Sequence, residues 1–177
     1  MLASLVAGCE SSSVAKAARE RNPAPCPNII VLADAARFVE FAGEGEQLDD
    51  VAFSGEIEDV SLACRYFADK PIEASISVDL AFGKGPAAPS FEKEFKYFVA
   101  VTRTDLEVIA KKEFSIPVTF SKKDAIKRFE EEVDSIVIPR ANEGTAGTNF
   151  EVIVGFVVTP AQAVFNRSGK SLKFPDL

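Results

Sequence analysis

The chain has 177 residues, a formal charge of −7 and no histidine or tryptophan. Its length favours a single domain with a real core, and its 47% hydrophobic and 27% charged residues are typical of a globular protein. The acidic balance argues against a nucleic-acid-binding module, which needs a basic face. The lack of histidine removes the commonest general base and the commonest metal ligand.

The first nine residues, MLASLVAGC, end in Val6-Ala7-Gly8-Cys9. An apolar residue and two small ones before a cysteine resemble the lipobox of bacterial lipoproteins. The resemblance implies cleavage before Cys9 and lipidation of Cys9, which would anchor the chain to a membrane. Glu10 follows in place of the aspartate that often retains such proteins at the inner membrane, which favours the outer membrane.

No lysine or arginine precedes Cys9, and the apolar stretch is shorter than that of a secretory signal. We therefore expect residues 1–8 to be the remnant of a longer signal peptide and residues 9–28 to be a lipidated tether. The alternative is a cytosolic protein with a chance cysteine. No apolar run approaches the roughly 20 residues of a transmembrane helix.

Lipidation of Cys9 leaves two cysteines, Cys26 and Cys64. An even remainder in an exported protein indicates a disulfide, which would pin the end of the tether to a strand. The alternative is two free thiols in the core. Zinc and thioredoxin-like chemistry have no support, because the chain contains no C-x-x-C motif.

From residue 29 onward apolar residues mostly alternate, which predicts β-strands. Short apolar segments lie at 29–32 and 38–41. The alternation changes parity near Glu58-Asp59, which indicates a bulge or a bend between strands. The clearest strand is 72–82, followed by strands at 95–101, 106–110 and 114–120. Pro117 should place the last of these at a sheet edge or bulge.

The secondary structure of residues 121–138 is ambiguous. Ile126, Phe129 and Val133 have helical spacing, whereas the β-branched 136–138 favours a strand. A strand at 150–158 has apolar residues on both faces, so we expect it to be central in its sheet. Thr159-Pro160 predicts a helix start and a short helix to about residue 166, with residues 167–177 as a tail.

Seven or more strands with almost no helix predict an all-β domain over 29–166. We expect an immunoglobulin-like or fibronectin-III-like antiparallel β-sandwich with a short C-terminal helix. The chain resembles uncharacterised Gram-negative lipoproteins in its lipobox, Cys-Pro pair, Ala-Cys-Arg-Tyr at 63–66, Phe-Val-Ala-Val at 98–101 and Thr-Pro-led terminal segment. That resemblance implies a place on the periplasmic face of the envelope and brings no known activity.

Candidate chemistry is sparse. Ser121 lies beside Lys122 and Lys123, but adjacent strand residues face opposite ways. The runs Asp49-Asp50 and Glu130-Glu131-Glu132 are typical of a solvated surface rather than of a calcium or glycosidase site. Tyr66 and Tyr97 fall on apolar strand faces, so we expect both in the core. The sequence therefore predicts no catalytic residue, no metal site and no cofactor.

These observations favour a non-catalytic, membrane-anchored envelope lipoprotein that acts as a structural or protein-binding subunit. Its partner would be another envelope or membrane protein complex, bound through strand edges or loops. The alternative is a periplasmic glycan-binding module or a small carboxylate-based hydrolase. A deep polar pocket with converging carboxylates would favour the alternative, and an apolar patch or a free strand edge would favour protein binding.

Overall fold

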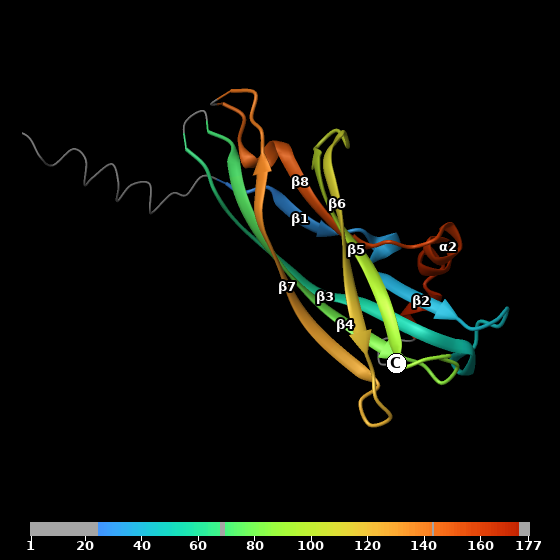
Figure 1. Ribbon diagram of the computed structural model, residues 1–177. Coiled ribbons are helices and arrows are strands. Elements are labelled where there is room, and N and C mark those ends of the chain that lie inside the picture. Colours follow the sequence, from blue (N-terminus) through green and yellow to red (C-terminus); the bar gives the residue numbers. More distant parts are fainter. Residues whose placement is uncertain (1–24, 68–69, 143, 174–177) are drawn as a thin grey trace, which may run out of the picture.

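The computed structural model describes residues 25–67, 70–142 and 144–173. Within these ranges eight strands form two four-stranded sheets, packed face to face as a sandwich (Figure 1). The elements are β1 (Asn28–Val31), η1 (Ala33–Ala35), β2 (Arg37–Phe41), η2 (Leu48–Asp50), β3 (Val51–Arg65), β4 (Ile72–Lys84), β5 (Glu92–Arg103), β6 (Val108–Thr119), β7 (Ile126–Ile138), η3 (Gly147–Asn149), β8 (Phe150–Phe156), α2 (Pro160–Arg167) and η4 (Lys170–Lys173). The predicted β-sandwich with one short C-terminal helix is confirmed.

The strand order is β1-β8-β5-β6 in one sheet and β2-β3-β4-β7 in the other. β1 runs parallel to β8, and the remaining pairs are antiparallel. β8 lies between β1 and β5, so its predicted central position is confirmed. Three successive strands, β2, β3 and β4, are neighbours, an arrangement that the ABED and CFG sheets of an immunoglobulin constant domain do not contain.

The parity switch near Glu58 is a β-bulge inside one long strand. The β3–β4 register shifts between Ile57 and Asp59, while β3 continues from Val51 to Arg65. Residues 126–138, which the sequence left ambiguous, form strand β7 along their whole length. β7 pairs with β4 over eleven registered positions, and this ladder overrides a weak local preference for helix.

Phenylalanines fill the space between the sheets. The rings of Phe82 and Phe95 stack with centroids 4.2 Å apart, and Phe38 meets Phe95 edge-on at 5.4 Å. A Cβ at Gly55 would lie 3.1 Å from the Phe156 ring, so a glycine here makes room for that ring. Each aromatic pair adds about 0.5–1.5 kcal/mol beyond the burial of its area.

Helix α2 closes one side of the sandwich, beside β2 and η1 (Figure 1). Its predicted N-cap is confirmed, because the Thr159 hydroxyl accepts from the Gln162 amide at 3.2 Å. Phe165 packs edge-on against Phe41 at 5.4 Å, and the Asn166 side chain donates to two backbone carbonyls of the η1–β2 segment. Of the tail expected at 167–177, Arg167 still belongs to α2 and Lys170–Lys173 form the 3-10 helix η4, while residues 174–177 lie outside the described residues.

The opposite side of the sandwich is open. β6 ends one sheet and β7 ends the other, and both lie on the side away from α2 (Figure 1). Within the described ranges, residues 120–125, which link β6 to β7 at one end, are the segment that crosses between the sheets there. No described element covers the two outermost strands on this side. We call this surface the open side.

Candidate functional site

The structure joins Cys26 and Cys64 in the disulfide expected from the sequence, with their Cα atoms 5.7 Å apart. Cys9 and the rest of the residues up to 24 lie outside the described residues, so lipidation of Cys9 stays a prediction. Among the described residues, none of the helices has the length and apolar character needed to cross a bilayer.

Tyr66, which was expected in the core, packs against the edge of a buried cluster but is not fully buried. Its ring is half-buried, and its hydroxyl donates to the Pro25 carbonyl at 2.8 Å and accepts from the Gly147 amide at 3.0 Å. The Arg140 guanidinium lies 4.6 Å from the ring centroid. At the end of β3 the ring no longer has a strand on each side, so its polar tip takes backbone partners and fixes the incoming chain beside the disulfide. Tyr97 is in the core, as predicted, at 1% exposure.

The residues weighed for catalysis do not converge. Ser121, Lys122 and Lys123 are exposed in the link between β6 and β7. Asp49 and Asp50 belong to η2, and Glu130 to Glu132 alternate across the two faces of β7. No group of three or more metal-binding side chains occurs in the part of the chain that the structure describes.

An apolar groove of about 220 Å³ runs along the open side between β6 and β7. Its floor is buried core, and its walls are half-buried side chains of the two edge strands. The floor consists of Val99, Val101 and Ile138, and the walls of Ile109, Phe114, Val133 and Ile136. Exposed Val108 and Val137, at 61% and 60%, extend the apolar surface towards the end of the sandwich that carries the disulfide.

The outer edge of β6 pairs with no strand among the described residues. The Phe120 amide donates to the Phe91 carbonyl at 2.7 Å, which fixes the alternation of the β5–β6 ladder. Residues of the opposite parity, Lys111, Glu113 and Ser115, therefore direct their amides away from β5. Pro117, which has no amide hydrogen, falls in the same outward set, so its predicted edge position is confirmed.

The β7 edge is similar up to its bulge. The Lys84 amide donates to the Ala125 carbonyl at 2.8 Å, so the alternation turns the amides of Arg128, Glu130 and Glu132 outward. The register then shifts opposite Ser75, where Asp134 and Ser135 occupy the space of one residue. Each edge thus offers a short row of backbone donors and acceptors beside the groove.

Two positions at the open side have strained backbone. Leu106 has φ of 71° and Ser135 has φ of 61°, and they are the two non-glycine residues with positive φ among those described. Ser135 lines the groove, and Leu106, 72% exposed, sits in the turn that leads into β6. A bulky residue with positive φ is uncommon, and such strain clusters at binding and active sites.

Charges of opposite sign border the groove. Lys111 and Lys112 lie on β6, while Glu130 to Glu132 and Asp134 lie on β7. Glu131 faces the sandwich interior, because it shares the inward parity of Phe129 and Val133 on β7. Burial, and after it the charge of Glu131, raises the pKa of the Tyr97 hydroxyl to about 12. The β6 edge is therefore the basic wall of the groove and the β7 edge the acidic one.

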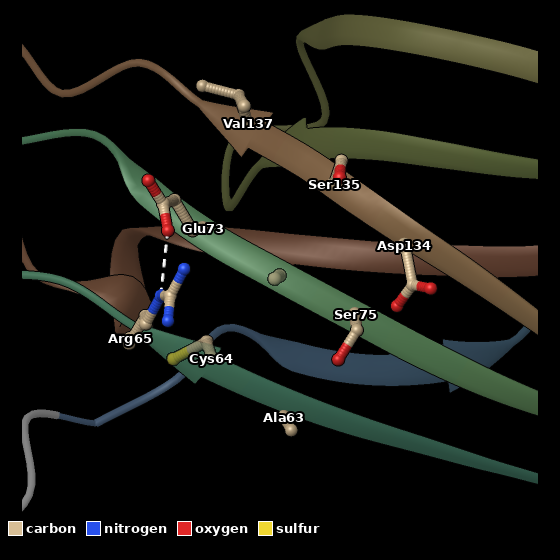
Figure 2. Close-up of a pocket in the computed structure, with 9 residues that line it drawn as sticks. Ala63, Cys64, Arg65, Glu73, Ser75, Asp134, Ser135 and Val137 are labelled. Atoms are coloured by element: carbon tan, nitrogen blue, oxygen red, sulfur yellow. Dashed lines mark hydrogen bonds and ion pairs between the residues drawn. The ribbon is translucent and has the colours of Figure 1, made fainter.

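A second hollow, of about 670 Å³, lies on the outer face of the sheet where β3, β4 and β7 meet the disulfide end (Figure 2). Glu73 turns toward Arg65, which it binds at 2.7 Å, whereas Asp134 lies beside Ser75 (Figure 2). The two carboxylates do not point at a common space. This hollow is broad and exposed, unlike the deep pocket that a carboxylate-based hydrolase needs.

No protein-family model and no curated protein matches the chain. A solved structure with some likeness is the variable (V) domain of the AgI/II polypeptide BspA of Streptococcus agalactiae. It is 12% identical, with a TM-score of 0.17, over 73% of this chain and 77% of that one. The likeness is too low to indicate a shared function.

The sequence alone did not predict a functional role for Leu106, Val108 or Val137. Leu106 was expected to begin a strand at 106–110, but it lies in the turn before β6, where an apolar residue has no core to enter. The two strands expected at 106–110 and 114–120 are one continuous strand, β6. The groove itself has no local signal, because it exists only where two edge strands from different sheets meet.

Proposed function

We propose that this chain is a lipid-anchored, non-catalytic protein of the bacterial envelope that binds a polypeptide through the open side of its sandwich. The observation that carries the proposal is the pair of strand edges, unpaired within the part of the chain that the structure describes, that flank an apolar groove. The anchor at Cys9 and a periplasmic location, with the outer membrane favoured, belong to the same proposal. They are supported by the lipobox-like residues 6–9 and by the Cys26–Cys64 disulfide.

A polypeptide suits this surface better than a glycan or a lipid. An added strand supplies alternating donors and acceptors to the outward amides of an edge, and its alternate side chains enter a groove. Lipid tails have no backbone donors or acceptors and no alternating side chains. Glycans pack on aromatic platforms. Phe114 is the one aromatic side chain among the described residues that line the groove.

The position of the tether fits the proposal. Cys64 precedes Arg65, which pairs in register with Glu73, and Glu73 pairs with Val137. The disulfide and exposed Val137 therefore lie at the same end of the sandwich. A chain anchored through Cys9 would carry its apolar surface at the membrane-facing end, within reach of an envelope protein.

Site-specific photo-crosslinking in intact cells tests the proposal. A photoreactive residue replaces Val108 or Val137 at the open side, and the matched controls carry it at Leu48 or Val164, which are exposed elsewhere. We expect a crosslinked polypeptide from the open-side positions and little from the controls. Absence of polypeptide adducts at Val108 and Val137, or equal adducts at the controls, would overturn the proposal.

A further inference from the structure

Building on the proposed function, we infer that the polypeptide bound at the open side is a second copy of this chain. The two copies form a two-fold dimer in which β6 of each copy pairs with β7 of the other. Three observations carry this assignment: the charge of the two edges, their relative direction and the area that they offer.

The two edge strands carry opposite charge. β6 has two lysines and one glutamate, a net charge of +1, whereas β7 has two basic and four acidic side chains, a net charge of −2. Pairing β7 with another β7 would bring its carboxylates against each other, and like charges directly opposite destabilise a ladder. Pairing β6 with β7 brings Lys111 and Lys112 of one copy to the level of Asp134 of the other.

The direction of the two strands lets the β6–β7 pairing stop at two copies, without a free edge on the open side. β6 and β7 run in opposite directions, because the link at 120–125 joins them at one end (Figure 1). A two-fold axis parallel to the strands keeps strand direction and exchanges the sheets, so each β6 lies antiparallel to the partner's β7. Both edges of both copies are then paired, and no free edge remains on this side to extend the assembly.

The two-fold axis also brings opposite charges of the two copies to the same level along the strands. Lys111, Lys112 and Asp134 line the same groove and so lie at one level along the strands. A rotation about an axis along the strands preserves that level, and it brings the lysines of one copy beside Asp134 of the other. Lys111 contacts Glu113 at 3.0 Å within its own strand, but an exposed pair of this kind contributes little and exchanges readily.

The area matches a stable dimer. A twelve-residue strand is about 40 Å long, and two sheets about 10 Å apart with their side chains present a side roughly 20 Å wide. The open side therefore offers about 800 Å² per copy, the typical contribution of each partner in a specific complex. The groove walls of Ile109, Phe114, Val133 and Ile136 would become the apolar centre of that interface.

The test measures mass in solution with the full chain, purified with Cys9→Ser so that no lipid drives association. We expect twice the chain mass of 19.1 kDa. The variants Lys111→Glu/Lys112→Glu and Asp134→Lys should each weaken the dimer by about 100-fold, because each sets like charges across both ladders at the level that Lys111, Lys112 and Asp134 share. An equimolar mixture of the two variants should restore a dimer, because both ladders then join opposite charges.

The matched control is Lys122→Glu/Lys123→Glu, which makes the same charge change in the exposed link and should leave the dimer intact. Thermal unfolding checks that each variant is folded. A monomeric parent chain, a dimer that survives either reversal, or folded variants that do not associate when mixed would overturn this inference. A monomer in solution together with cellular crosslinks from Val108 to a different protein overturns the dimer alone, whereas absence of any crosslink overturns the proposed function.

Discussion

The Cys26–Cys64 disulfide allows a quantitative prediction of stability. It closes a segment with a sequence separation of 38 residues. Loop-closure entropy for a segment of that length gives about 4 kcal/mol of stabilisation through the unfolded state. Chemical reduction is the cleanest perturbation, because it keeps the Cys64 side chain, which packs against a buried cluster that includes Ile72 and Phe150.

For a domain of about 150 residues, each kcal/mol moves Tm by about 2–4 °C, so reduction should lower Tm by about 8–16 °C. The assay is thermal unfolding of the Cys9→Ser chain by circular dichroism, with and without a phosphine reductant. Alkylation followed by mass spectrometry should count no free thiol before reduction and two after it. The variant Cys26→Ala/Cys64→Ala, which has no bond to lose, should not respond to the reductant.

Two results would refute the reasoning. Two alkylatable thiols in the unreduced protein would show that the bond does not form. A shift below about 2 °C, with thiols rising from none to two, would show that the tether end is held equally well without the bond. In that case the Tyr66 hydroxyl, which holds the Pro25 carbonyl at 2.8 Å, would be the first contact to remove by Tyr66→Phe.

Three further predictions follow from the anchor, the buried tyrosine and the strained turn. Cys9→Ser, or a lipoprotein signal-peptidase inhibitor such as globomycin, should leave an uncleaved precursor by mass spectrometry; normal processing would contradict the anchor. The pKa of Tyr97 is about 12 when folded and about 10 when unfolded, so the unfolded chain ionises first. Stability should therefore fall between pH 10 and 12, by on the order of 2 kcal/mol in urea unfolding, and less in Tyr97→Phe. Leu106→Gly should raise Tm by about 2–4 °C by relieving the positive φ, whereas Leu106→Ala, which keeps that strain, should not.

Much of the strand content could be predicted, because the alternation of apolar and polar residues is a local property of the sequence. The strand expected at 72–82 is β4, and Pro117 lies in an edge strand as expected. β7 was ambiguous for a physical reason: Phe129 and Val133 are four residues apart, a spacing that places two side chains on the same face of either a helix or a strand. Only pairing with β4, which is distant in sequence, decides between them.

The candidate site could be predicted only in part. Compartment and cysteine count were sufficient to expect the Cys26–Cys64 bond. The polar role of Tyr66 at the edge of the core could not be predicted, because its hydrogen-bond partners, Pro25 and Gly147, come from segments 41 and 81 residues away. The open side had no counterpart in the sequence, since it depends on which strands end the two sheets, and strand order is set by pairings that no local pattern encodes.

The edges of β6 and β7 are only partly blocked from pairing with another strand, and this pattern is consistent with pairing to one selected partner. Free strand edges are usually blocked by proline, bulges or inward-facing charges. Here Pro117 and the Ser135 bulge limit the lengths of the free edges, and Glu131 adds an inward charge on β7, but the rows at 111–115 and 128–132 keep their outward amides. A chain that only needed to avoid association would block these rows too. A chain that must bind one partner in one register would block the ends and leave the centre, which is the arrangement observed.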